Sequence, residues 1–183
     1  TIQVWNLDNP LAPRRILDFE GHDADATRMV FTPDEKRLVS CGMDRTIRVW
    51  DLAKPGESRV YRDEFPELTG LALSPDGRTL IAAPVSYTSA NPKFPTGLVA
   101  MNEISGEVGC WELEGTGLRR APSFDLGTAP MRVAYSAAGD RVAAAGVDGR
   151  VRVWDGVSRR LLHQFQASGQ ALALEFSHDG QRL

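Results

Sequence analysis

The chain has 183 residues, of which 42% are hydrophobic and 25% charged, a balance typical of a soluble globular domain with a sizeable core. Its formal net charge of −3 argues against a nucleic-acid partner or an anionic membrane surface, because such binding depends on an excess of basic residues. No apolar run approaches the roughly 20 residues of a membrane-spanning helix, and the first residues lack the features of a signal peptide.

The two cysteines, Cys41 and Cys110, fall in strand-like segments and have no C-x-x-C spacing or paired histidines. We therefore expect buried free thiols rather than a disulfide or a metal site. His163 and His178 have no carboxylate or cysteine at ligand spacing, and the aspartates and glutamates are scattered at turns rather than paired. No glycine-rich phosphate loop of the strand-to-helix type is expected without helices. We expect a cytoplasmic protein that binds no cofactor and no metal.

An internal repeat organises the chain. Trp5, Trp50, Trp111 and Trp154 each end a similar segment, in TIQVWNL, TIRVWDL, EVGCWEL and RVRVWDG. A second set of segments, FTPDE, LSPDG, YSAAG and FSHDG, recurs at a matching phase. Both signals indicate a unit of about 40 to 45 residues with one enlarged member.

Within each unit the hydrophobic pattern has the period of a strand. In Thr46 to Trp50, Ile47 and Val49 would face one way while Arg48 and Trp50 face the other. Pro-Asp and Asp-Gly pairs mark the reversals between strands, and no segment has a helical period. Each unit is therefore predicted to hold four short antiparallel strands: a before the PDG-type turn, b after it, c ending on tryptophan, and d leading onward.

Gly21-His22, followed by FTPDE, SCGMD and TIRVWDL, resembles the repeat of the WD-repeat (WD40) β-propeller family, and weaker copies extend the likeness over nearly the whole chain. The resemblance implies an all-β protein in which four-stranded antiparallel blades surround a channel. The chain begins in strand c and ends in strand b, which gives about four repeats' worth: a c-d half, three full blades and an a-b half. Because such propellers commonly have seven blades, we expect an arc of a longer ring whose remaining blades belong to the parent chain. The alternative is that the two halves pair and close a four-bladed ring.

This phase gives one repeat domain, 1–183, with five parts. They are residues 1–20 for strands c and d of the first blade, 21–63 for the second blade, 64–124 for the third, 125–166 for the fourth, and 167–183 for strands a and b of a fifth. The third blade is enlarged by an insertion, 84–103, between strands b and c. Loops of this length are more often functional than not, although this one could also be a longer hairpin with a solvated tip.

His22, Ser40 and Asp44 are the residue types of a serine hydrolase triad. In the family that the chain resembles, these types and a tryptophan, here Trp50, form a buried hydrogen-bonded tetrad. No G-x-S-x-G elbow surrounds Ser40, and a buried imidazole and indole both need hydrogen-bond partners. We therefore expect a structural tetrad with no catalytic residue.

Only the second blade has the whole tetrad. The fourth blade keeps Asp148 and Trp154 but has Leu126 and Ala144 at the histidine and serine positions. The third blade departs further, so we expect the second blade to be the stiffest and the third the loosest in amide exchange.

The resemblance also places partner contacts on the face formed by the b-c and d-a loops. The corresponding residues are Asp25, Thr27 and Met43 in the second blade, Glu67 and Thr69 in the third, and Ala129, Met131 and Val147 in the fourth. Tyr87, Lys93 and Phe94 of the insertion would stand above this face. Its methionines suit a protein or peptide better than a polar metabolite. The alternative is that these residues line the channel and bind nothing.

Arginine pairs recur at the start of three of the d strands, at Arg14-Arg15, Arg119-Arg120 and Arg159-Arg160. We expect them to protect exposed sheet edges from aggregation.

The sequence thus predicts a non-catalytic protein-interaction scaffold. A second hypothesis is a sensory or regulatory propeller appended to an enzyme, such as a kinase or protease, in the same polypeptide. A third, less favoured hypothesis is a propeller hydrolase that uses His22, Ser40 and Asp44.

Overall fold

The computed structural model describes residues 1–62, 67–85 and 106–183, and these residues form strands, turns and bends with no helix. None of them forms a helix long and apolar enough to cross a membrane. The strands are β1 (Ile2–Asn6), β2 (Arg14–Phe19), β3 (Ala26–Phe31), β4 (Arg37–Gly42), β5 (Thr46–Asp51), β6 (Ser58–Arg62), β7 (Glu67–Leu73), β8 (Thr79–Val85), β9 (Glu107–Glu114), β10 (Gly117–Asp125), β11 (Pro130–Tyr135), β12 (Arg141–Gly146), β13 (Arg150–Asp155) and β14 (Leu161–Gln166).

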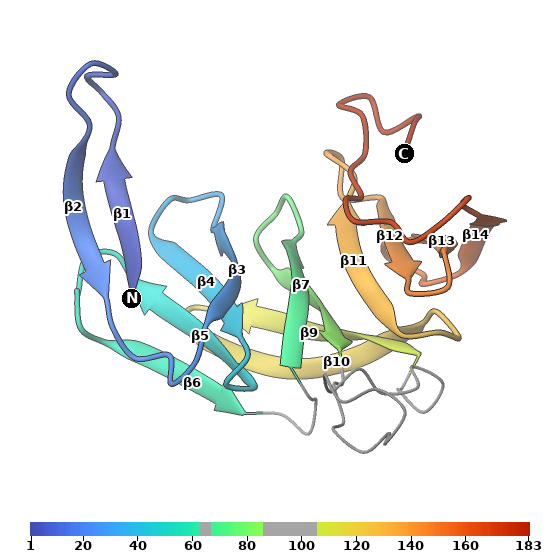
Figure 1. The fold of residues 1–183 in the computed structure, drawn as a ribbon, viewed down its shortest axis with the longest axis horizontal. Coiled ribbons are helices and arrows are strands. Elements are labelled where there is room, and N and C mark those ends of the chain that lie inside the picture. Colours follow the sequence, from blue (N-terminus) through green and yellow to red (C-terminus); the bar gives the residue numbers. More distant parts are fainter. Residues whose placement is uncertain (63–66, 86–105) are drawn as a thin grey trace.

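The strands form a two-stranded sheet, β1-β2, and three four-stranded sheets, each in the order of the chain and antiparallel throughout. We call β3–β6 the second blade, β7–β10 the third and β11–β14 the fourth. Figure 1 shows the sheets following one another around an open arc, with the β1-β2 hairpin at one end and the fourth blade at the other. The predicted all-β blade architecture is confirmed, and the two ends do not pair into a closed four-bladed ring.

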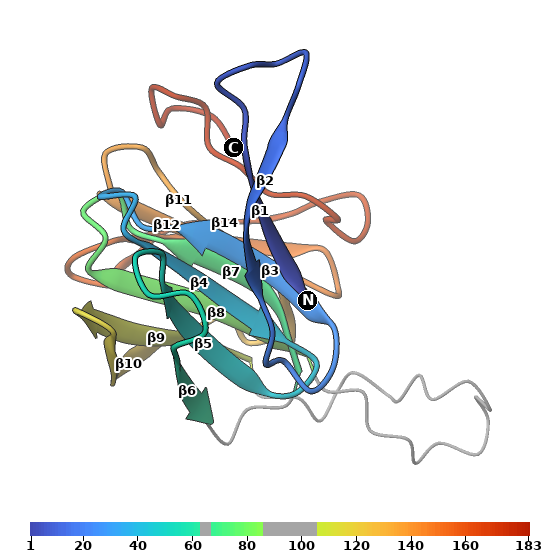
Figure 2. The same cartoon turned by 90° about the vertical axis from the view of Figure 1, so that its left-hand side faces the viewer.

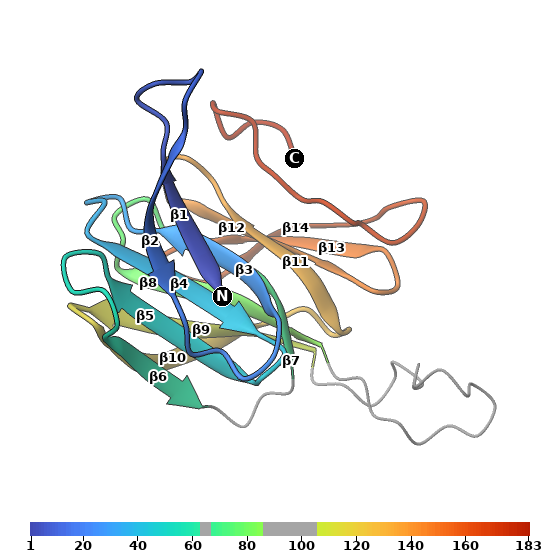
Figure 3. The same cartoon turned by 60° about the vertical axis from the view of Figure 1, so that its left-hand side comes forward.

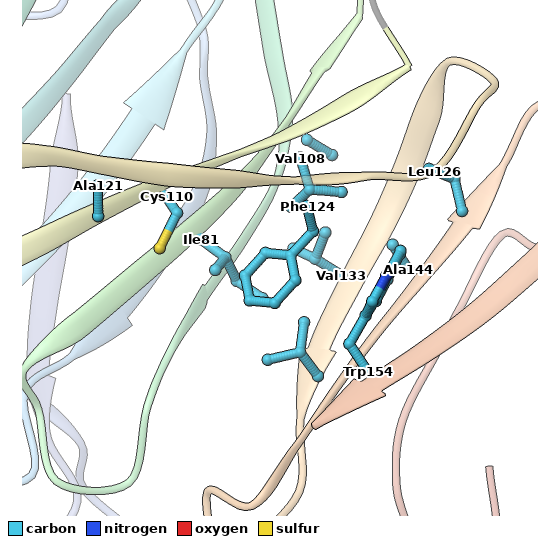
Figure 4. Packing of buried hydrophobic residues seen from close by; sticks show 11 residues of the cluster. Ile81, Val108, Cys110, Ala121, Phe124, Leu126, Val133, Ala144 and Trp154 are labelled. Atoms are coloured by element: carbon cyan, nitrogen blue, oxygen red, sulfur yellow. The ribbon is translucent and has the colours of Figure 1, made fainter. Parts of the chain in front are cut away.

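The hydrophobic cores lie between neighbouring sheets, which face one another in succession (Figure 2, Figure 3). Ile47 and Val49 belong to the core shared with the third blade, whereas Trp50 belongs to the core shared with the β1-β2 hairpin. This is the alternation that the sequence of β5 predicts, because successive side chains of a strand point to opposite faces. A third core joins the third and fourth blades (Figure 4).

The turn between strands a and b is closed by the same backbone hydrogen bond in each unit, and in each a hydroxyl residue also bonds to an aspartate of the turn. In the third blade, Ser74 donates its hydroxyl to Asp76 and its N–H to the Thr79 carbonyl. The hydrogen bond from Ser74 holds the pKa of the Asp76 carboxyl below its usual value. The hydroxyl residue that precedes each Pro-Asp type turn thus supplies hydrogen bonds that close the turn.

The last part of the chain departs from the prediction. The turn at 177–182 forms, with the Ser177 N–H bonded to the Arg182 carbonyl, but 167–183 contain no strand. This segment is attached to the fourth blade by Arg132, which donates to the Leu172 carbonyl.

Neighbouring blades are also joined by hydrogen bonds. Thr27 of the second blade donates its hydroxyl to the Leu68 carbonyl of the third. Tyr61 donates to the Thr116 carbonyl at 2.7 Å, and Arg37 donates to the Gly115 carbonyl. These bonds connect both the inner and the outer parts of the two blades.

Candidate functional site

The candidate site is the loop face, by which we mean the b-c turns and d-a loops on one side of the arc. In the second blade the Met43 N–H donates to the Asp25 carbonyl at 2.9 Å. In the fourth blade the Val147 N–H donates to the Ala129 carbonyl at 3.0 Å. Two pairs of residues that the sequence analysis assigned to partner binding are therefore joined through their backbones.

Two glycines make this approach of the loops possible. A Cβ atom added at Gly42 would lie 2.7 Å from the Asp25 carbonyl oxygen, and one added at Gly146 would lie 2.2 Å from Thr128 Cγ2. Both contacts are too short for any side chain. The sequence analysis did not identify these glycines, although both stand two residues before the turn aspartate, in CGMD and AGVD.

The candidate partner-binding residues differ in exposure. Asp25 and Met43 are exposed, and 42% of the Met43 surface is accessible. The half-buried candidates are Thr27, Thr69, Met131 and Val147. Ala129 is fully buried, so only its backbone reaches the loop face.

Three further candidates, Tyr87, Lys93 and Phe94, lie outside the described residues, together with most of the insertion 84–103. Glu67 begins β7, but its side chain is not among those described.

Thr27 uses its hydroxyl inside the protein, since it donates to the Cys41 and Leu68 carbonyls.

Beneath the loop face of the second blade, four side chains form one hydrogen-bonded network. His22 Nδ1 lies 2.8 Å from Asp44 Oδ2, and His22 Nε2 lies 2.7 Å from Ser40 Oγ. Trp50 Nε1 donates to Ser40 Oγ at 2.9 Å. Because a carboxylate only accepts, His22 carries its proton on Nδ1 and accepts the Ser40 hydroxyl proton at Nε2. Every polar atom named here then has a partner.

Asp44 is the most heavily bonded member. Burial raises the pKa of its carboxyl, but hydrogen bonds from Thr46, His22 and the Asp23 N–H outweigh this effect, and the pKa lies below its ordinary value. The side chains of His22 and Asp44 are each only 4% exposed. The carboxylate therefore ties the d-a loop to the b-c turn in an environment largely closed to water.

The contacts of His22, Ser40 and Asp44 match the pairwise pattern of a serine hydrolase triad, but their surroundings differ. Ser40 is fully buried, and its oxygen already accepts a hydrogen bond from Trp50, which is 1% exposed. An activated serine must be reachable by the substrate carbonyl, which this arrangement prevents.

The fourth blade fills the same space with apolar groups. Leu126 and Ala144 are fully buried beside Trp154, as Figure 4 shows. Phe124, from strand d of the third blade, packs on Trp154 with ring centroids 5.5 Å apart. Phe19, from strand d of the hairpin, packs on Trp50 at 5.0 Å. The sequence analysis did not identify this phenylalanine, which precedes the histidine position by two or three residues in both places. In the third blade Glu64 stands at the histidine position of the tetrad and Ser105 at the aspartate position, and both lie outside the described residues.

Within the described ranges, no group of histidine, cysteine, aspartate and glutamate side chains has the arrangement of a metal site. Cys41 and Cys110 are buried and unpaired, as the sequence predicts. Burial raises the pKa of the Cys41 thiol to about 11, so this thiol is unreactive at neutral pH.

Comparison with known proteins places the geometry in context. The family model "WD domain, G-beta repeat" matches residues 13–51 and 127–155, which include the tetrad and Trp154. Periodic tryptophan protein 2 from Arabidopsis thaliana is 26% identical over 168 residues, covering 81% of this chain and 16% of the relative. WD repeat-containing protein 1 from Gallus gallus is 28% identical over 167 residues, covering 88% of this chain and 23% of the relative. DDB1- and CUL4-associated factor 13 from Dictyostelium discoideum is 43% identical over 54 residues, covering 30% of this chain and 12% of the relative. The chain thus spans less than a quarter of the length of each of these relatives.

Proposed function

Because the chain belongs to the WD-repeat family, we propose that it is a non-catalytic interaction scaffold that binds a protein or peptide on its loop face. The observation that carries this proposal is the pair of backbone bonds, Met43 to Asp25 and Val147 to Ala129, which holds each b-c turn against its d-a loop. A surface whose loops are already fixed loses little conformational entropy on binding.

The composition of this face supports a protein or peptide ligand. Met43 exposes a flexible apolar side chain next to the exposed Asp25, and Met131 and Val147 add partly buried apolar surface. Methionine adapts to irregular apolar ligands, and a polar neighbour adds selectivity. The Dictyostelium relative is named for its association with DDB1 and CUL4, and a relative from rice is named as a guanine nucleotide-binding protein subunit beta. Both names describe proteins that act with other proteins, which agrees with the proposed class.

In this proposal the tetrad of His22, Ser40, Asp44 and Trp50 supports the loop face and performs no reaction. It anchors the d-a loop through His22 and the b-c turn through Asp44, so that Asp25 and Met43 stay in place. An activity-based fluorophosphonate probe should leave Ser40 unlabelled. Labelling of Ser40 that is lost in His22→Ala would instead support the hydrolase hypothesis.

The test is a comparison of proteins retained by the wild-type chain and by a Met43→Glu/Met131→Glu variant. We expect partners identified by mass spectrometry with the wild type to be reduced at least about tenfold, since two charges would enter an apolar contact. Met29→Glu is a matched control, because Met29 is 50% exposed on β3, away from the b-c turns and d-a loops. Undiminished capture by the double variant, or equal loss in the control, would show that partners bind elsewhere.

A further inference from the structure

Strand β14 differs from the other outer strands of the structure. The outer strands β2, β6 and β10 contain arginines, and β10 also contains Pro122. Such residues protect an exposed sheet edge from pairing with another chain. β14, with the sequence LLHQFQ, has neither a charged residue nor a proline. The arginine pair expected to protect it, Arg159-Arg160, ends just before its first residue.

Alternate residues of β14 direct their backbone N–H and C=O groups away from β13. Ala167 N–H donates to the Gly149 carbonyl, and the register pairs Phe165 with Val151 and His163 with Val153. Since backbone groups alternate sides along an antiparallel strand, His163 and Phe165 bond to β13. Gln164 and Gln166 therefore direct their N–H and C=O groups outward, where the sheet order has no further strand among the described residues.

We propose that β14 pairs antiparallel with β14 of a second copy of this chain, with the two-fold axis at Gln164. In this register His163 faces Phe165 of the other copy and Leu162 faces Gln166, so no like charges oppose each other. The same pairing through β6 would bring the arginines of two copies together, which is unfavourable. Because this edge is uncharged and its residues complement one another across the two-fold axis, it favours pairing with a second copy of β14 over pairing with a charged partner.

The exposed side chains of β14 add to this pairing. Phe165 is 47% exposed and lies on the face that carries His163, since the two residues pair with Val151 and Val153 of β13. Leu161 is 45% exposed and pairs with Trp154 beyond a register shift, on the other face. Their contacts across the junction supplement the backbone hydrogen bonds. A single strand junction is small, so the dimer is weak and depends on concentration. Because the pairing uses the same edge on both copies, it closes at two.

The first experiment measures mass against protein concentration by sedimentation equilibrium. The wild type should shift from monomer to dimer, and Gln164→Lys should raise the dissociation constant at least about tenfold because two lysines would oppose each other. Val60→Lys, an equivalent change in the middle of the charged strand β6, should leave the dimer intact. A wild type that is monomeric at all concentrations overturns the proposal, whatever else binds this edge. Assemblies larger than two overturn the closed register.

Gln164 also accepts a hydrogen bond from Arg152 at 2.7 Å, so a second test leaves this residue unchanged. His163→Cys and Phe165→Cys are prepared separately and mixed under mild oxidation. The proposed register makes residues 163 and 165 of the two copies a non-hydrogen-bonded pair, with Cα atoms about 4.5 Å apart, within the range of a disulfide. The mixture should give a crosslinked dimer several times faster than either variant alone. Equal crosslinking in all three samples, or none, would contradict the register.

The proposal is independent of the loop face. Met43→Glu/Met131→Glu should retain the dimer, and Gln164→Lys should retain the partners captured by the loop face. Loss of both properties in either variant would show that the two surfaces are not separate.

Discussion

The second and fourth blades hold the same tryptophan in two different ways. Trp50 is bonded to Ser40 within the polar tetrad, whereas Trp154 lies against Leu126 and Ala144. Both indoles are buried, at 1% and 4% exposure, and both pack on a phenylalanine of the preceding unit. The aromatic contact is therefore the shared element. The histidine and serine of the network can be replaced by apolar groups when both change together, since neither is then left buried without the other.

The largest effect should come from placing one polar residue of the tetrad in the apolar arrangement of the fourth blade. Leu126→His would bury an imidazole beside Ala144, without a serine partner, and should lower the free energy of unfolding by about 2 to 4 kcal/mol. Urea denaturation measures this loss. Leu126→Met is the matched control and should cost less than about 1.5 kcal/mol, because the side-chain volume is kept.

Adding Ala144→Ser to Leu126→His should recover part of that loss. Asp148 and Trp154 are already present, so the double variant would contain all four residue types of the second blade. A double variant less stable than Leu126→His alone would contradict the view that the two arrangements are interchangeable.

A smaller loss is expected in the second blade. His22→Ala and Ser40→Ala should each cost about 1 to 3 kcal/mol, because each leaves a buried partner unsatisfied. The double variant should cost less than the sum of the two, since the shared bond of 2.7 Å is counted twice. Urea denaturation of the four proteins gives the coupling energy, and strict additivity would show that the tetrad does not act as a unit.

The pH dependence of Asp44 should be smaller still. Its pKa in the folded chain is lowered from the ordinary value of 3.8. The stabilisation from the ionised carboxylate is therefore complete above that value and is lost as the pH falls toward the folded pKa. The stability difference between wild type and Asp44→Asn should be constant near neutrality and shrink below about pH 4. A difference that is unchanged at low pH would assign the effect to packing alone.

The smallest change concerns Cys41, which lies in the core between the second and third blades. Because burial raises its pKa to about 11, the thiol should react with a maleimide at pH 8 at least about a hundredfold more slowly in the folded chain than in urea. Val60→Cys, on an exposed edge, provides the fast reference. Rapid labelling of Cys41 would reveal frequent opening between these blades.

Much of the fold can be predicted from the sequence because two independent markers, the tryptophans and the Pro-Asp type turns, have the same period. The alternation of Ile47, Val49 and Trp50 correctly predicts that Trp50 faces away from the other two, and the structure places them in two different cores. The free, buried state of the two cysteines is also confirmed. The absence of strands from 167–183 could not be predicted, because an alternating pattern in a sequence does not show whether the segment is hydrogen-bonded to a neighbour.

The candidate site is only partly predictable. Family resemblance identifies the loops, but not the direction of each side chain, so Ala129 proves buried and Thr27 bonds within the core of the arc. Gly42 and Gly146 are required by the approach of two loops that are distant in sequence. The contacts of Phe19 and Phe124 cross from one unit to the next, where a single-repeat pattern carries no information.

The bonds that join the second blade to the third have a consequence for sequence divergence. Thr27, Tyr61 and Arg37 all donate to main-chain carbonyls of the third blade, at Leu68, Thr116 and Gly115. Substitutions that keep the backbone path leave these acceptors unchanged. Outside the core that the two blades share, the third blade can therefore change its side chains without losing these bonds, and a unit attached in this way is a permissive place for new sequence to arise.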